Sequence, residues 1–395
     1  MSLIPQIGAV VAMNLRNLPQ RLGPAFVIIV GSAGVVAVLV AVLAMAGGMA
    51  KTLQGTGRED RAIVLRNGSA SESGSALTRN AARIISDAPG IKHDHDGKPL
   101  VTAEPLRLLK LFKRDDESEV TAVLRGLGAQ APLVRPEMKI VEGRLFRASV
   151  NELVVGKAAK AQYRNTEVGS HILTRTATWV VVGVFTTNGD AHESELMADA
   201  DTVMSSDNGS TYGSVTVSLD APGSLRTLAD SLSANPALRV DVTRERDYFS
   251  RQSTTVNRLL SVLVYVVGSI MGVGALFGAL NAMYSAVSTR TTEIATLRAI
   301  GFGSAPIVVS VLIEALLLAG AGGILGAGAA WLLLNGRAVS TTQGSANAQL
   351  VFDISVTLQL AIVGVAVSSL IGFIGGLFPA IRAARLPIAT ALRRI

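Results

Sequence analysis

The chain has 395 residues, of which 49% are hydrophobic, and its mean hydropathy is +0.44. Soluble domains are rarely so apolar, so this composition indicates a membrane protein. The net charge of +7 would suit nucleic-acid binding, but aromatic residues make up only 4% of the chain, too few for base-stacking platforms. We therefore expect no nucleic-acid partner. The absence of cysteine excludes disulfides, thiolate metal sites and cysteine nucleophiles.

Four apolar stretches are long enough to cross a bilayer, which takes about 20 residues of helix. They cover residues 24–46, 259–287, 307–334 and 358–380, and none contains lysine, arginine or aspartate. The first stretch could instead be a secretory signal, because arginines precede it. Its length exceeds the roughly 7–15 apolar residues of a signal core, so we predict a retained transmembrane helix.

Arginines in the short flanking segments predict the orientation, since cytoplasmic loops carry an excess of positive charge. Segments 1–23, 288–306 and 381–395 carry that excess: Arg16 and Arg21, then Arg290 and Arg298 against Glu293, then Arg382, Arg385, Arg393 and Arg394. These segments are predicted to be cytoplasmic, with residues 4–18 lying on the membrane surface as an amphipathic helix. Residues 47–258 form a large outer domain, and residues 335–357 a short outer loop.

The outer domain shows mixed strand and helix patterns, which favour an α+β fold. Stretches rich in β-branched residues and bounded by turn residues predict strands at residues 62–66, 120–124, 152–155, 179–185 and 214–219. Helices are expected at residues 76–86 and 224–234. In the second, Ser224 caps the start, and Leu225, Leu228 and Leu232 share one face. Residues 242–258 are charged and predict a helical stalk that leads into the second span.

Few residues in the sequence suggest a metal-binding or catalytic site. The HDHD run at residues 93–96 could bring two metal ligands to one side of an extended strand, but neighbouring turn residues favour a solvated loop. His171 and His192 are isolated and are expected at the surface. The sequence contains no nucleophile elbow, no H-E-x-x-H and no G-x-x-x-x-G-K-[ST] motif. We therefore expect a non-enzymatic membrane subunit without a cofactor of its own.

Small residues repeat every four positions inside all four apolar stretches, a spacing that lets helix backbones approach closely. Such pairs also arise by chance in glycine-rich helices, and the packing they predict is within one chain or between chains. We expect the ridges of the first two spans to pair two copies of the protein. These ridges consist of Ala33, Ala37 and Ala41 in the first span and of Gly268 and Gly272 in the second.

Several motifs occur in one order along nearly the whole chain. The cytoplasmic loop reads RTTEIATLRAIGF at residues 290–302 and is followed by EALL at 314–317, and the tail reads PAIRAARLP at 379–387 with ALR at 391–393. The outer domain contains EGRLF at 142–146, NELVVG at 151–156, VG at 168–169 and VVGV at 181–184. In these motifs the chain resembles the FtsX-like, MacB-type permeases of ABC transporters.

The resemblance implies a permease subunit in the bacterial inner membrane that pairs with a dimer of ABC ATPase subunits and with a second permease, either another copy of itself or a related permease. Because the chain begins close to its first span, we expect the ATPase, with its ATP and Mg²⁺, on a separate chain. A periplasmic adaptor and an outer-membrane component are further expected partners. Export or extraction of a substrate is the leading hypothesis. A signalling permease that activates a periplasmic partner such as a cell-wall hydrolase is the alternative. An ion-coupled transporter is disfavoured, because it would need several ionisable residues within the spans.

Two features near the cytoplasmic side are predicted to have a role in coupling or in packing of the spans: the connection at residues 288–302 and Glu314. Residues 288–302 form the longest cytoplasmic connection and have a helix-compatible pattern, so we expect them to dock into the ATPase rather than serve only as a positive anchor. The residues concerned are Arg290, Glu293, Leu297, Arg298, Gly301 and Phe302, with Gly301 ending the helix. Glu314 is the one ionisable residue within the spans. We expect it to bond to Asn281 or to backbone of a neighbouring span, with a proton or substrate site as the alternative.

Overall fold

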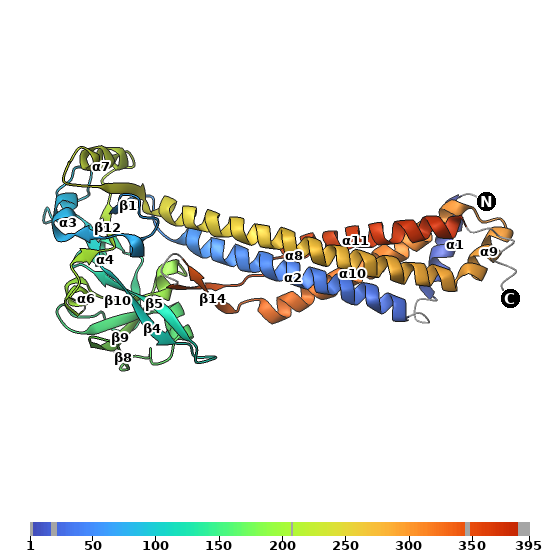
Figure 1. The fold of residues 1–395 in the computed structure, drawn as a ribbon, viewed down its shortest axis with the longest axis horizontal. Helices are drawn as coiled ribbons and strands as arrows, with labels where there is room; N and C mark the ends of the chain where they lie inside the picture. The colour runs from blue at the N-terminus through green and yellow to red at the C-terminus, as the bar shows by residue number, and fades with distance from the viewer. Residues whose placement is uncertain (1–2, 17–21, 207, 344–347, 386–395) are drawn as a thin grey trace. The chain divides into compact units, whose positions relative to one another are not determined.

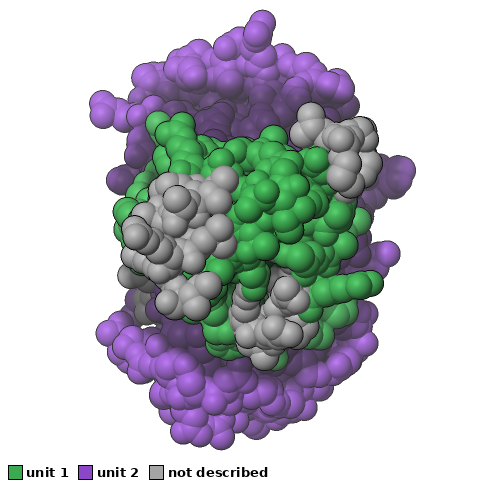
Figure 2. All heavy atoms as spheres, turned by 90° about the vertical axis from the view of Figure 1, so that its right-hand side faces the viewer, with its two compact units in different colours: residues 1–47, 257–337, 354–395 green, residues 48–256, 338–353 purple. Residues whose placement is uncertain are grey.

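The computed structural model describes residues 3–16, 22–206, 208–343 and 348–385. Two predicted features, Arg21 and the arginines of the tail beyond Arg385, lie outside the described residues. The chain divides into two compact units, which Figure 2 distinguishes by colour. The helical unit comprises residues 1–47, 257–337 and 354–395, and the α/β unit comprises residues 48–256 and 338–353.

Four long apolar helices have the length and composition of membrane spans. They are α2 (Leu22–Gly55), α8 (Glu245–Thr289), α10 (Ser304–Leu334) and α11 (Leu358–Ala384). Two shorter helices, α1 (Leu3–Arg16) and α9 (Thr291–Ala299), lie at one end of the helical unit (Figure 1). At that end the start of α2, the end of α8, α9, the start of α10 and the end of α11 share one apolar core. The helices therefore alternate in direction, as the predicted topology requires.

Glycines set the distance between these helices. An added Cβ at Gly322 or Gly326 of α10 would lie within 2.5 Å of atoms on α2. At Gly372 of α11 it would lie 2.4 Å from the Cβ of Ala319 on α10. The small residues thus pack the helices of a single chain tightly against one another. This packing matters in lipid, where the hydrophobic effect does not drive helices together.

The α/β unit contains two main sheets and confirms the α+β fold class. The larger, nine-stranded sheet has the strand order β14-β15-β5-β10-β7-β9-β6, with β4 beside β5 and β8 beside β9. The four-stranded sheet is antiparallel, in the order β13-β1-β12-β3, and β2 pairs with β11. The strands are β1 (Arg61–Arg66), β2 (Leu77–Thr78), β3 (Val101–Glu104), β4 (Leu106–Phe112), β5 (Glu119–Leu127), β6 (Lys139–Gly143), β7 (Glu152–Gly156), β8 (His171–Leu173), β9 (Thr178–Thr186), β10 (Leu196–Asp199), β11 (Thr211–Tyr212), β12 (Ser214–Ser218), β13 (Val240–Arg244), β14 (Ala338–Gln343) and β15 (Ala348–Asp353).

Helices cover these sheets and complete their cores. They are α3 (Arg79–Ser86), α4 (Ala131–Val134), α5 (Lys157–Gln162), α6 (Ala200–Ser206) and α7 (Ser224–Ser233), with 3₁₀ turns η2 (Glu72–Gly74) and η3 (Ala191–Ser194). The leucines Leu228 and Leu232 of α7 are buried in one apolar core with Val215 and Val217 of β12. A separate core lies against the larger sheet around Trp179 and Tyr163.

All five predicted strands are present, but several details of the prediction are wrong. The helix expected at 76–86 begins only at Arg79, because Leu77 and Thr78 pair with β11. Gly223, not Ser224, occupies the cap position of α7, and the Ser224 hydroxyl bonds to the Asp220 carboxylate instead. The first residues of the expected stalk belong to β13. Residues 338–343 and 348–353 of the expected loop form the antiparallel strands β14 and β15, and β15 joins the larger sheet through β5.

Candidate coupling site

The helix α9 is the centre of the predicted coupling segment. Arg290 occupies its cap position, Ile294 belongs to the apolar core of the helical unit, and Ala295 is also buried. The helix ends in a Schellman motif: Gly301 N–H donates to the Arg298 carbonyl and Phe302 N–H to the Leu297 carbonyl. Gly301 has a φ of +106°, a conformation that favours glycine, as expected for a residue that ends this helix.

The opposite side of α9 is open. Glu293 is exposed, and Leu297, Arg298 and Phe302 are partly exposed. Glu293 and Leu297 are four residues apart and therefore lie on one side of the helix. Ile300, at the end of α9, is 72% exposed although it is a large apolar residue. This side of α9 therefore presents both apolar and charged residues at the surface of the chain.

Arg290 points inward rather than toward this surface. Its two terminal nitrogens each donate to one carboxylate oxygen of Glu314 at 2.6 Å, and both residues are at least 96% buried. Such a paired, two-point contact is the strongest geometry between arginine and a carboxylate. The pair joins the beginning of α9 to α10. It also neutralises the one acidic residue within the predicted spans.

The partner expected for Glu314 was therefore wrong. Asn281 lies on an exposed side of α8, whereas both carboxylate oxygens of Glu314 bind Arg290. The sequence contained a usable signal, because Arg290 directly follows the second span and Glu314 lies a few turns into the third. Neighbouring antiparallel helices bring such positions to similar depth. A buried carboxylate in lipid then takes the nearest cation.

The small residues expected between two copies also have neighbours within their own chain. The Cα of Ala33 lies 2.9 Å from a Cβ built on Gly326 of α10. A Cβ built on Gly268 would lie 4.0 Å from the side chain of Leu39 on α2, and one built on Gly272 would lie 4.0 Å from the side chain of Ile371 on α11. Ala37 and Ala41 are partly exposed. In contrast, a Cβ on Gly274 or Gly278 of α8 would meet nothing within 4 Å.

A second set of buried charges lies within the α/β unit and was not predicted. Arg125 of β5 donates to Glu72, Glu104 and Glu195, at 2.6–3.0 Å. Arg135, which follows α4, binds Glu104 again and also Glu245, the first residue of α8. Arg61 of β1 binds Glu245 and Glu137. We call these eight residues the charge cluster. It connects the four-stranded sheet, the nine-stranded sheet and the beginning of α8.

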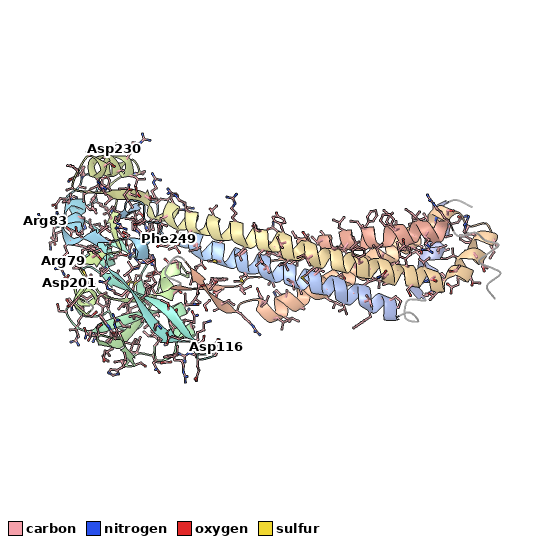
Figure 3. All side chains as sticks on the ribbon, in the orientation of Figure 1. Arg79, Arg83, Asp116, Asp201, Asp230 and Phe249 are labelled. Carbon is pink, nitrogen blue, oxygen red and sulfur yellow. The ribbon has the colours of Figure 1, made fainter. Side chains whose placement is uncertain are left out.

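The electrostatics of the charge cluster follow from its burial. Burial alone would raise the pKa of Glu245, but the charges of Arg135 and Arg61 outweigh burial and lower this pKa to about 2. His192 lies against the cluster and is 2% exposed, so its expected surface position was wrong. Its ring is 3.3 Å from Glu195 and stacks edge-on with Phe249 of α8, a residue labelled in Figure 3.

The other histidines show no site for chemistry. The Asp94 carboxylate accepts hydrogen bonds from the backbone of Asp96 and Lys98, which makes residues 93–98 a tight loop. His171 is exposed on β8. Among the described residues, no group of three or more histidines and carboxylates has the arrangement of a metal site.

Family models match most of the chain. The MacB-like periplasmic core domain matches residues 25–235, and the FtsX-like permease C-terminal domain matches residues 265–388. The macrolide export ATP-binding/permease protein MacB of Campylobacter fetus subsp. fetus (strain 82-40) is 27% identical over 294 residues, which are 67% of this chain and 43% of the relative. An uncharacterized ABC transporter permease, YknZ of Bacillus subtilis (strain 168), is 32% identical over 142 residues, which are 35% of this chain and 33% of YknZ.

This chain thus spans less than half the length of these relatives. Two solved structures are also similar. The periplasmic region of MacB from Actinobacillus actinomycetemcomitans has 19% identity and a TM-score of 0.36, and the match covers 54% of this chain and 97% of that chain. The extracellular domain of the YknZ transporter from Gram-positive bacteria has 16% identity and a TM-score of 0.33, covering 46% and 99%.

Proposed function

The chain belongs to the family of FtsX-like ABC transporter permeases with a MacB-like periplasmic core domain, and on this basis we propose that it couples ATP hydrolysis to a conformational change in its periplasmic domain. The ATP and Mg²⁺ are bound by a separate ATPase subunit in the cytoplasm. The change in the periplasmic domain serves export or extraction of a substrate. The protein lies in the bacterial inner membrane, with both termini in the cytoplasm.

One observation carries this proposal: the way in which α9 is held. Its inner side is fixed by Ile294 in the apolar core, by the buried Ala295 and by Arg290 bound to Glu314 of α10. Its outer side presents Glu293 and Leu297. A short helix that is capped at its end and anchored to a span moves as one piece with that span. A push from a docked ATPase on α9 would therefore reach α10.

The docking surface can be tested on α9 itself. Glu293→Arg and Leu297→Asp should reduce stimulation of the ATPase by about tenfold, the effect of losing about 1.4 kcal/mol at an interface. Thr292→Arg is the control, because it places the same arginine side chain at an exposed residue on another side of the same helix. The measurement is the ATPase rate of the purified complex, with membrane insertion checked in parallel. Normal stimulation of the ATPase by both Glu293→Arg and Leu297→Asp would contradict the proposal.

We also propose that two copies pair through α8, on the side that the chain itself leaves open. Across the most apolar 18 residues of this helix none is buried, and Gly274 and Gly278 allow close approach of a second helix. The native chain has no cysteine, so single cysteines report the contact cleanly. Gly274→Cys should form a disulfide-linked dimer in membranes, and Gly268→Cys, which faces Leu39, should not. Equal crosslinking at both positions, or none at either, would contradict this interface.

A further inference from the structure

A hollow of about 660 Å³ lies between α10 and α11 in the helical unit. It is located where α10 ends and α11 begins, at the end of the bundle opposite α9. Its walls are almost wholly apolar and include Ile324, Gly328, Trp331, Leu358, Ile362 and Val365. No charged residue lines it, and it belongs to neither the α9 surface nor the charge cluster.

Small residues form part of the walls of the hollow and leave space there. Polar side chains at the end of α10 and the start of α11 bond to backbone N–H groups there. A Cβ built on Gly328 would meet no atom within 4 Å. The Asn335 side chain accepts a hydrogen bond from Val356 N–H, and the Thr357 hydroxyl accepts one from Leu360 N–H. These bonds fix the connection between the two helices.

The surroundings of the hollow identify its occupant. Both helices have the composition of membrane spans, so the medium outside the opening is hydrocarbon. Trp331 is 51% exposed near the end of α10, and half-exposed tryptophans are typical of the boundary between hydrocarbon and head groups. Arg337 follows on the polar side of this boundary. Its carbonyl accepts from Ile354 N–H, two residues before Val356 of the hollow, and its side chain is exposed.

We propose that this hollow binds one acyl chain of a phospholipid whose phosphate lies beside Arg337. The acyl chain fills the space between α10 and α11, which the side chains do not fill. The guanidinium makes no ion pair with a carboxylate of the described residues, so its charge is available to an anionic head group. Bound there, the lipid supports the separation of the two helices at this end of the bundle.

The two tryptophans of the chain provide the experiment. Trp331 lies at the hollow, and Trp179 is buried in the α/β unit. Phosphatidylglycerol brominated near the head-group end of its chains is added to the full protein in detergent micelles, and quenching of tryptophan fluorescence is followed. We expect quenching that saturates near one lipid per chain. Trp331→Phe, which leaves only Trp179, should show none.

Matched variants separate the hollow from general contact with lipid. Gly328→Leu fills the hollow and should abolish most of the saturable quenching. Gly320→Leu places the same side chain on the same helix, at another position where a Cβ meets nothing within 4 Å, and should leave quenching unchanged. Arg337→Gln should weaken apparent binding by about fivefold, as expected for one arginine near an anionic lipid.

Three outcomes would overturn the proposal. Quenching that rises without saturation and is indifferent to Gly328→Leu would mean only annular contact with bulk lipid. Equal affinity for a brominated long-chain alcohol without phosphate would remove the role of Arg337. Efficient disulfide crosslinking between copies through Ile362→Cys would show that a second chain, and not lipid, covers the hollow.

Discussion

The helical unit and the α/β unit both contain buried arginine–glutamate contacts, but they use them in different amounts. Among its described residues, the helical unit has one such ion pair, Arg290 with Glu314, and otherwise relies on close packing of small residues. The α/β unit pairs three buried arginines with five carboxylates in the charge cluster, of which Glu72, Glu104 and Glu245 are buried, although it also has apolar cores of its own. The medium around each unit explains the difference.

Within a bilayer an apolar side chain gains little by moving from lipid to protein, so backbones must approach closely to stabilise the bundle. Each unpaired charge is expensive there, and the helical unit keeps a single pair at the beginning of α9. In water, apolar cores already stabilise the two sheets of the α/β unit. Buried ion pairs then add little net stability, but they specify one alignment of the parts they connect. We infer that the charge cluster fixes the two sheets and the beginning of α8 in one arrangement.

The largest effect is expected from breaking the charge cluster at its centre. Arg125→Met should leave Glu72, Glu104 and Glu195 without their shared cation and destabilise the α/β unit by about 3–5 kcal/mol. Thermal unfolding of the full protein carrying Trp331→Phe, followed by the fluorescence of buried Trp179, would measure this loss.

The control is an exposed ion pair of the same unit. Arg114→Met removes the partner of Glu167, whose side chain is 49% exposed, and should change stability by about 0–1 kcal/mol. If Arg125→Met behaves like this control, the carboxylates of the charge cluster do not depend on Arg125. The contrast between the two units would then fail.

A somewhat smaller effect is expected in the helical unit. Glu314→Gln leaves the Arg290 charge buried without a counter-ion, at a cost of about 2.5–3.5 kcal/mol on membrane insertion scales. An amide would have sufficed for the hydrogen bond first expected with Asn281, but it cannot neutralise Arg290. We expect lower thermal stability in detergent together with reduced ATPase stimulation.

The double variant sharpens this prediction. Arg290→Leu combined with Glu314→Leu removes both charges and should recover most of the stability, because no buried ion remains unpaired. Stimulation should stay low, since α9 has lost its link to α10. Full recovery of stimulation would show that the pair has no role in coupling.

The sequence predicted those features that depend on local pattern. The length and apolarity of the stretches are sufficient to predict the four spans, and runs of β-branched residues are sufficient to predict the five strands. The paired strands β14 and β15 were missed because residues 335–357 were interpreted as a loop, although Leu350 and Phe352 alternate with polar or smaller neighbours. The charge cluster had no local signal at all. Arg125 meets Glu72 and Glu195 from positions 53 and 70 residues away, and only the packing of the sheets brings them together.

The smallest effect concerns pH and tests whether the charge cluster includes His192. Burial and the nearby Arg135 favour the neutral ring, whereas Glu195 and Asp190 favour the imidazolium, and the carboxylates raise the pKa above its ordinary 6.5. Glu245 of α8 also interacts with this ring. A pKa raised by folding means that the protonated ring stabilises the folded state. This stabilisation is complete below the unfolded-state pKa and is lost as pH rises through the folded-state pKa.

The unfolding temperature of the α/β unit should therefore fall as pH increases above 6.5, and His192→Gln should flatten that dependence. A wild-type curve that rises with pH over this interval would show that His192 is neutral in the folded protein and lies outside the electrostatic balance of the cluster.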